Sequence, residues 1–400
     1  MSTTADQHPL AGAEPLGVAS IRAAVAPVLA RLADGSRQRE GTRDYAFEEV
    51  RELAAQRIAL TGIAREDGGA GGSVRDVADL VIAIARADSN VAQALRGSFV
   101  TADVVATHGD PASRERTLER LRAGELFAIS SNDRSGGGIA LREVGGELVL
   151  SGKTYYSTGA LYAHWFTGLA TDEAGRVVRF TVPLAREGVE RLDDFDAVGQ
   201  RLTASGTTAL HDVRVGPDEL ARDDEPAPRN PWPGTFAQLH LAAIEAGIAA
   251  AALDDAVWFG RARARPIKHS SAERAVDDPY VQHVVGEIAA RANAARAAVL
   301  LAAEVLGEVW RAPDEDVREA AAGAAVAVAQ AQYVAVEAAL RSGELLFDVG
   351  SGSATDRRHA LDRHWRNART VANHNPRRWK AAVAGRFHLS GEEPPLSGLF

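Results

Sequence analysis

Residues 151–165 read SGKTYYSTGALYAHW, a stretch in which aromatic and hydroxyl side chains follow one another closely. The apolar run Leu148–Leu150 precedes it, and a second apolar run, His164–Ala170, overlaps its end. Short apolar runs with turn residues between them are typical of strands. An aromatic ring system could stack and be hydrogen-bonded where such a strand ends, so this stretch is the first candidate for a binding site.

The chain on the N-terminal side has a different pattern. Residues 16–122 carry apolar side chains at three-to-four spacing, as at Val77, Leu80, Val81 and Ile84, which predicts amphipathic helices. Ser73 is a plausible N-cap for the helix that contains these residues. Residues 123–225, which include the quoted stretch, add the apolar run 177–182 and the alternating run 207–215, and predict a mainly antiparallel β domain.

The chain on the C-terminal side is helical again. Residues 226–234 are rich in proline and predict a linker. Within residues 235–400, long Ala-rich stretches at about 235–263, 278–311 and 314–349 predict helices whose small side chains permit close packing in a four-helix bundle. Residues 1–15 are polar and unpatterned and predict a flexible leader. The expected fold class is therefore α+β, in the order helical domain, antiparallel β domain, helical bundle.

The composition limits the class of protein. The 400 residues are 46% hydrophobic and 25% charged, an ordinary globular balance that excludes disordered and collagen-like chains. No run of about 18 apolar residues predicts a membrane span, and residues 1–30 do not have the order of a secretory signal, so a cytoplasmic protein without a membrane partner is expected. The net charge is −9 without a basic stripe, which argues against a nucleic-acid partner. Cysteine is absent, so disulfides and thiolate metal sites are excluded.

Most catalytic motifs are missing from the chain. It has no Gly-x-Ser-x-Gly elbow, no Walker loop and no His-Glu-x-x-His. His359, His364 and His374 have a spacing that fits no common metal site, so no metal is expected. The stretch 361–370, LDRHWRNART, has three arginines in seven residues and is either a solvated face or a site for an anion such as a phosphate. The residues by themselves leave both interpretations open.

Three motifs carry a resemblance to a known family. The order of the three parts is similar to that of the acyl-CoA dehydrogenase fold. Within it, the chain resembles the branch of flavin-dependent monooxygenases that contains dibenzothiophene monooxygenase and the sulfur-acquisition (SfnB-like) oxidoreductases. The motifs that carry this resemblance are Tyr156–Trp165, Gly199–Thr207 and Leu361–Thr370.

The resemblance implies an activity. It implies that reduced FMN, supplied by a separate NAD(P)H:flavin reductase, reacts with molecular oxygen to form a flavin hydroperoxide that oxygenates a small organosulfur or similar compound. The enzyme would exclude water and hold the flavin ring. A homotetramer is also implied.

The resemblance also implies the site residues. Ser157 would hydrogen-bond the reactive edge of the flavin, and His374 would donate a hydrogen bond to the peroxide or act as an acid or base. Phe195 takes the place of a flavin-contacting tryptophan, and Arg263 or Arg265 would reach the phosphate of a flavin in a neighbouring subunit. The other residues expected to bind the cofactor are Ser130, Ser131, Tyr156, Thr158, Arg366, Asn367 and Arg369.

Two alternatives remain open from the sequence. The first is an FAD-dependent acyl-CoA dehydrogenase, which needs a carboxylate base; Asn375 occupies the usual place of that base, and an amide cannot act as one. Some relatives carry the base on the first bundle helix, where the nearest residues here are His240 and Glu245.

The second alternative is a catalytically degraded flavin-binding protein. It is motivated by three positions at which the resembling family has polar groups. The monooxygenases usually have a histidine after a helix that ends Ala-Gln-x-Leu-Arg, where this chain has Gly97-Ser98-Phe99. Ile129 and Val371 stand at the two other positions, which in the family carry an asparagine and a histidine.

Overall fold

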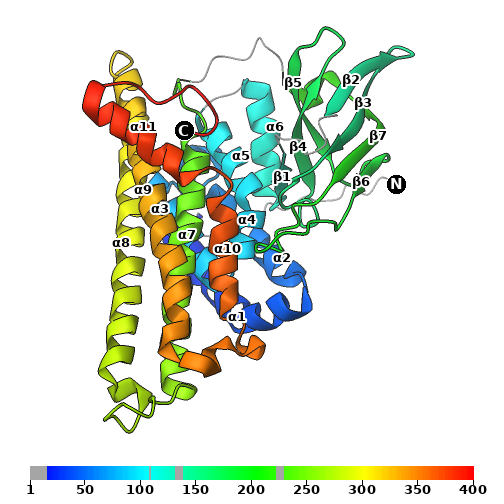
Figure 1. Cartoon of the computed structure of the whole chain (residues 1–400). Helices are drawn as coiled ribbons and strands as arrows, with labels where there is room; N and C mark the ends of the chain where they lie inside the picture. Colours follow the sequence, from blue (N-terminus) through cyan, green and yellow to red (C-terminus); the bar gives the residue numbers. More distant parts are fainter. Residues whose placement is uncertain (1–15, 108–109, 131–137, 222–228) are drawn as a thin grey trace, which may run out of the picture.

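The computed structural model describes residues 16–107, 110–130, 138–221 and 229–400. Figure 1 shows a long helical part that stands beside a β domain. The expected leader 1–15 and residues 226–228 of the expected linker lie outside the described residues. The N-terminal helices are α1 (Val18–Thr42), α2 (Phe47–Ala55), α3 (Val74–Ala87), α4 (Ser89–Ala94), α5 (Arg96–Thr107) and α6 (Pro111–Arg122).

Helix α3 shows how local sequence defines these elements. The Oγ of Ser73 accepts a hydrogen bond from the backbone N–H of Asp76, and the Asp76 carboxylate accepts one from the N–H of Ser73, which forms a reciprocal cap. The predicted stripe Val77, Leu80, Val81 and Ile84 is buried and belongs to the main hydrophobic core. Its apolar face fixes α3 against the C-terminal helices.

The β domain is one sheet of mostly antiparallel strands. Its order is β6-β7-β3-β2-β4-β5-β8, and β1 pairs in parallel with β4. The run Leu148–Leu150 lies in β3 and the run 177–182 in β5, as the sequence pattern predicted. The strands are β1 (Phe127–Ile129), β2 (Ile139–Val144), β3 (Glu147–Thr154), β4 (Trp165–Thr171), β5 (Val177–Pro183), β6 (Val189–Arg191), β7 (Thr208–Val215) and β8 (Leu220–Ala221).

The C-terminal part is built on long Ala-rich helices that pack on one another and on α3. Gly247 of α7 lies so close to Ala85 of α3 that a Cβ at this position would overlap it, which shows how small side chains allow the helices to approach. The shorter α10 and α11 also pack on α9. The helices are α7 (Thr235–Ala262), α8 (Pro279–Val309), α9 (Val317–Leu345), α10 (Asp362–Ala372) and α11 (Arg377–Ser390).

Two of these helical stretches have the length and hydropathy of a membrane span. They are Thr235–Ala262 and Val317–Val349, and 83% and 61% of their most apolar windows are buried inside the protein. Burial of this extent identifies both as core helices of the bundle.

Candidate active site

The quoted stretch forms a tight turn at the end of β3. Tyr156 has a φ of +58°, and the backbone N–H of Ser157 donates to the carbonyl of Gly206 at 3.1 Å. The Oγ1 of Thr158 accepts a hydrogen bond from the Oγ of Ser205 at 3.1 Å. Ser157 has no exposed surface, and its Oγ has no hydrogen-bond partner among the described residues. A buried hydroxyl without a partner is uncommon and calls for an explanation.

A second hydroxyl group lies next to this turn. The Oγ of Ser130, at the end of β1, donates to the carbonyl of Tyr155 at 3.0 Å and shares a hydrogen bond with the Oγ1 of Thr154 at 2.8 Å. The structure therefore brings Ser130 to the turn that holds Ser157. Ser131, which was expected beside it, lies outside the described residues.

Three aromatic rings lie close together beside the turn. The ring centroids of Tyr155 and Tyr156 are 4.7 Å apart, and the ring of Phe195 lies 6.3 Å from Tyr155 and 6.5 Å from Tyr156. Phe195 is buried, whereas Tyr156 keeps 48% of its surface exposed. The exposed Tyr156 ring is available to stack on a planar ligand.

The second motif docks the β domain onto α10. The backbone N–H of Gln200 donates to the Oδ1 of Asn367 at 2.6 Å, and Gln200 and Asn367 both donate to the Oγ of Ser89. Gly199 lies against the carbonyl of Arg366, where a Cβ would overlap the oxygen. Because the polar atoms of Asn367 are engaged within the chain, its assignment to the cofactor remains a prediction.

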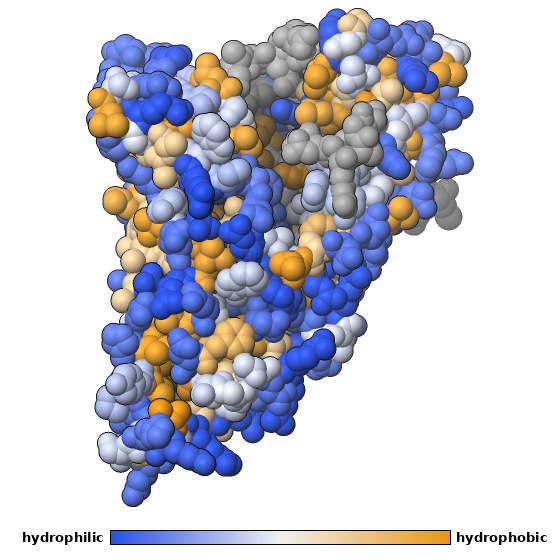
Figure 2. Space-filling model, viewed as in Figure 1, coloured by the Kyte–Doolittle hydropathy of each residue, from blue (hydrophilic) through white to orange (hydrophobic). Residues whose placement is uncertain are grey.

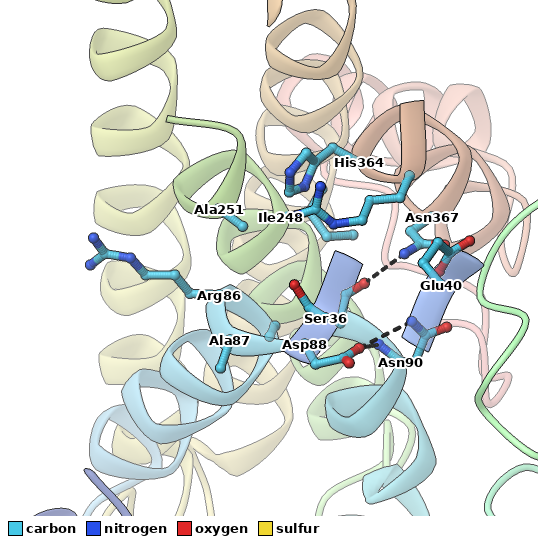
Figure 3. Close-up of a pocket in the computed structure, with 13 residues that line it drawn as sticks. Ser36, Glu40, Arg86, Ala87, Asp88, Asn90, Ile248, Ala251, His364 and Asn367 are labelled. Atoms are coloured by element: carbon cyan, nitrogen blue, oxygen red, sulfur yellow. Dashed lines mark hydrogen bonds between the residues drawn. The ribbon is translucent and has the colours of Figure 1, made fainter. Parts of the chain in front are cut away.

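Figure 3 shows the cavity beside these residues. Its volume is about 20 Å³, enough for a single water molecule and far too small for a flavin ring. Polar side chains form much of its wall. It is lined by Ser36, Glu40, Ala85, Arg86, Ala87, Asp88, Ser89, Asn90, Ile248, Ala251, Arg363, His364 and Asn367.

The arginines of the third motif fit neither of the two interpretations that the sequence left open, a solvated face or an anion site. Arg366 is ion-paired with the buried Glu40 at 2.7 Å and with Asp362 at 2.8 Å. Arg363 is buried and ion-paired with Asp255 at 2.7 Å. Two of the three arginines therefore bind carboxylates of the same chain, so this stretch is neither a merely solvated face nor three free cations. Arg369 has no ion pair among the described residues.

Asp255 is the centre of a buried ion cluster. Besides Arg363 it contacts His364 at 2.9 Å and Arg37 of α1 at 3.0 Å. Burial would raise the pKa of Asp255, but the hydrogen bond from His364 and the charges of Arg363 and Arg37 outweigh it and hold the pKa well below its usual value. Burial and the charge of Arg363 lower the pKa of His364, which favours the neutral ring beside an ionised Asp255.

The two arginines expected at a phosphate follow α7 and make no hydrogen bond or ion pair with the turn among the described residues. Arg263 and Arg265 are exposed and follow the C-terminal end of α7, at the lower end of the helical part in Figure 1. Ser157 follows β3 of the β domain. Their assignment to the phosphate of a flavin in a neighbouring subunit therefore remains a prediction.

His374 follows the end of α10. Figure 2 shows the surface of the molecule in the same view as Figure 1. The side chain of His374 is exposed, yet desolvation lowers its pKa to about 3, with a further contribution from the charge of Arg96. Its ring is therefore neutral at physiological pH.

The polar groups around His374 come from several elements. Gln238 of α7 accepts hydrogen bonds from the side chains of Asn375 and Lys380, and Lys380 also donates to the carbonyl of Leu399. Burial lowers the pKa of Lys380 to about 7. Asn375 is thus an amide in a buried network and cannot serve as a base.

Two residues of α7 considered as alternative bases are also enclosed. The Nε2 of His240 lies 3.1 Å from the carbonyl of Ala92, and burial lowers its pKa to about 3. Glu245 has no exposed surface, and burial raises its pKa well above the usual value. Neither of its carboxyl oxygens has a hydrogen-bond partner in the part of the chain that the structure describes. A carboxyl group held in the protonated form is a poor base.

Sequence reasoning missed Arg96. It is the first residue of α5, 8% exposed, and its charge acts on both His240 and His374. In the sequence, Arg96 stood out only as the last residue of the Ala-Gln-x-Leu-Arg pattern at residues 92–96, which resembles the family. With 42 arginines in the chain, since only three of the 45 basic residues are lysines, no sequence signal distinguishes a buried arginine from an exposed one.

The fold and the placement of these motifs define a class of protein. Two family models match the chain: the acyl-CoA dehydrogenase N-terminal domain over residues 18–125 and the acyl-CoA dehydrogenase C-terminal domain over residues 239–378. Together they cover more than half of the chain. The fold is therefore acyl-CoA dehydrogenase-like.

Related proteins show to which group of acyl-CoA dehydrogenase-like proteins the chain is similar. The chain is 28% identical over 375 residues to dibenzothiophene monooxygenase of Mycolicibacterium goodii, covering 89% of this chain and 90% of that protein. It is 28% identical over 334 residues to the probable FMNH2-dependent monooxygenase SfnC of Pseudomonas putida, covering 82% and 85%. The crystal structure of TdsC from Paenibacillus sp. A11-2 with FMN and indole matches with a TM-score of 0.86 at 24% identity, covering 95% of this chain and all of that one. The chain belongs to the flavin monooxygenases of the acyl-CoA dehydrogenase fold, a family of oxidoreductases.

Proposed function

We propose that this protein is a monooxygenase that uses reduced FMN and molecular oxygen to oxygenate a small organosulfur compound or a similar small molecule. The related proteins include a dibenzothiophene monooxygenase and a probable FMNH2-dependent monooxygenase, which supports both the cofactor and the reaction class. A separate NAD(P)H:flavin reductase supplies the reduced flavin, and the enzyme acts in the cytoplasm as a homotetramer.

The observation that carries this proposal is the convergence of the three motifs. Ser157 of the first motif is hydrogen-bonded to Gly206 of the second, and Gln200 of the second is hydrogen-bonded to Asn367 of the third. These motifs are far apart in the sequence, and each is buried where it meets the next. The three motifs resemble those of the family, and folding brings them into contact. Residues of one binding site must lie together in this way.

The residues of the turn fit a flavin. The Oγ of Ser157 lacks a partner, and a ring nitrogen or carbonyl of the isoalloxazine would supply one. The exposed Tyr156 and the buried Phe195 offer aromatic surface beside it. Since Ser157 has no exposed surface, a ring reaches its hydroxyl only when the side chains that cover it shift.

Bound reduced FMN supplies the two electrons that activate dioxygen. The chain's own residues hold the ring and exclude water. Ser157 donates from its Oγ, and Thr158 keeps the turn in place through Ser205. The neutral imidazole of His374 can donate one hydrogen bond from its ring N–H and accept one at the other nitrogen. Arg263 or Arg265 of a second copy would bind the phosphate.

The test combines the purified protein with FMN, NADH and a flavin reductase, and supplies aromatic sulfides, sulfoxides and sulfinates. Oxygenated product is expected only when the reductase is present, and mass spectrometry of copurified flavin is expected to show FMN. Tightly bound FAD that is bleached by an acyl-CoA without oxygen would establish the dehydrogenase alternative instead. Binding of FMN without turnover of any substrate would establish a degraded flavin-binding protein.

A further inference from the structure

Arg96 is held at a fixed place in the fold by its neighbours in the sequence. The Oγ of Ser98 accepts a hydrogen bond from the backbone N–H of Phe127 at 2.9 Å. Gly97 lies so close to β1 that a Cβ would overlap the carbonyl of Phe127. These contacts fix the start of α5 against the β domain, so the position of the Arg96 backbone is well determined.

The guanidinium of Arg96 is buried without a partner. Three arginines are buried among the described residues: Arg39, Arg363 and Arg96. Arg39 is ion-paired with Asp88 at 2.8 Å and Arg363 with Asp255 at 2.7 Å. Arg96 has neither a hydrogen bond nor an ion pair to any residue that the structure describes, and its Nε is completely enclosed. A buried charge without a partner costs several kcal/mol, so this guanidinium is expected to meet an anion supplied from outside the chain.

The charged groups around Arg96 do not neutralise it. Burial alone lowers its pKa to about 10, and no carboxylate contributes to the shift, so Arg96 stays protonated at physiological pH. Asp103 lies seven residues further along α5, roughly 10 Å at the rise of an α-helix, which is too far for an ion pair. His240 and His374, whose pKa values the charge of Arg96 lowers, are neutral.

We propose that Arg96 binds the acid group of an anionic organosulfur substrate, of which an organic sulfinate is the simplest case. This inference rests on the proposed function and specifies its substrate class. The planar guanidinium fork matches an acid group that presents two oxygens. Such a substrate would also provide the charge that Arg96 lacks within the chain.

The corresponding reaction is balanced. The sulfur of the sulfinate forms a bond to one atom of dioxygen and is oxidised by two electrons to a sulfonate. The O–O bond breaks, and the second oxygen atom leaves as water with two protons and two electrons supplied by reduced FMN. The acid group keeps its negative charge throughout, so Arg96 holds both substrate and product.

The test measures binding rather than turnover. Calorimetric titrations of the FMN-loaded protein use benzenesulfinate and the uncharged thioanisole as probes. The wild type is expected to bind benzenesulfinate more tightly than thioanisole. Arg96→Gln is expected to weaken benzenesulfinate binding about 10- to 100-fold, the range for charge-assisted hydrogen bonds, and to leave thioanisole binding within about twofold. Arg96→Lys, which keeps the charge but not the fork, is expected to lie between the two.

Arg75→Gln is the matched control, because it removes one positive charge from an exposed ion pair with Glu304 and is expected to change neither affinity. The proposal is overturned if the wild type prefers thioanisole, which can be measured even if Arg96→Gln does not fold. It is also overturned if Arg96→Gln keeps its benzenesulfinate affinity or loses FMN affinity instead. Failure of the wild type to bind FMN in a separate titration would count against the proposed function, not against the anion site.

Discussion

At the scale of single residues, buried polar atoms without partners mark the candidate site. Ser157, His240 and Glu245 each have such an atom in the part of the chain that the structure describes. Thr208 and Ser342 have such an atom as well, whereas the buried Asp255 is paired with Arg363. Unpartnered groups reduce stability unless a ligand or water completes them, so they indicate where the chain depends on something that it binds.

Replacement of Ser157 should have opposite effects on stability and on flavin binding. Ser157→Ala removes a hydroxyl that is buried without a partner, so the flavin-free protein should gain about 1 kcal/mol in free energy of unfolding. FMN affinity should fall about 5- to 10-fold, because the ring loses one hydrogen bond. Urea denaturation and FMN titration measure the two effects.

Thr208 provides the control for Ser157. Its Oγ1 on β7 is also buried without a partner among the described residues, and the residue has no exposed surface. Thr208→Val should increase stability without any change in FMN affinity. If Ser157→Ala behaves in the same way, Ser157 does not contact the flavin.

His240 should make the protein sensitive to acid. Its pKa is about 3 in the folded protein and about 6.5 in an unfolded chain, so below about pH 6.5 the unfolded chain takes up a proton that the folded protein does not. Stability due to the neutral ring is present above that pH and is lost as pH falls toward 3. The contribution to the slope is about 1.4 kcal/mol per pH unit.

His240→Gln should therefore flatten the decline in stability by about that slope between roughly pH 6 and 4, measured by urea denaturation at a series of pH values. The exposed His283→Gln serves as the control for the loss of a histidine. An unchanged slope in His240→Gln would show that this ring takes up its proton in the folded state as well.

At the scale of elements, α10 connects the β domain to the bundle. One side of it is hydrogen-bonded to residue 200 through Asn367, and its buried residues pack on α7 and α9. The segment 199–206 reaches it in a strained conformation, since Gln200 and Ala204 have φ values of +55° and +50°. Such strain persists only where surrounding contacts hold it.

Gly199→Ala should break this connection. Its Cβ would overlap the carbonyl of Arg366, which belongs to the helix backbone and cannot move aside easily, so the free energy of unfolding should fall by about 2 kcal/mol or more. Gly286→Ala in α8, where a Cβ meets nothing, should instead add about 0.5–1 kcal/mol. Thermal unfolding compares the two variants, and equal effects would show that residue 199 is not packed against α10.

At the scale of the whole molecule, the cluster around Asp255 joins three parts of the chain. Asp255 is on α7, Arg37 is on α1, and Arg363 and His364 are on α10. Helices distant in sequence are therefore tied together at one buried carboxylate. A buried pair of this kind adds little over an apolar core, but its disruption is expensive because it leaves a charge without its counterion.

Asp255→Asn should destabilise the protein by about 3–5 kcal/mol, since Arg363 remains buried without a carboxylate. The neighbouring Asp254 forms an exposed ion pair with Arg86, and Asp254→Asn should change stability by less than about 0.5 kcal/mol. Urea denaturation measures both variants. Similar small effects for both would show that the cluster around Asp255 is hydrated rather than buried.

The spacing of hydrophobic residues was sufficient to predict helices and strands, because this spacing depends only on the local geometry of the backbone. The three-to-four spacing at residues 77–84 and the alternation at 207–215 predicted a helix and a strand where α3 and β7 lie. The motifs 156–165, 199–207 and 361–370 were also visible in the sequence, and with them the family. The order of the parts therefore followed from the chain itself.

Pairing of charges was decided only by the tertiary structure. Arg363, Arg366 and Arg369 are equivalent in the sequence, yet the first two bind Asp255 and Glu40, residues contributed by α7 and α1. Arg96 looked like any other arginine and is buried with no partner among the described residues. The physical reason is that the energy of a charge depends on its distance to other charges and to water, and folding sets these distances between segments far apart in sequence.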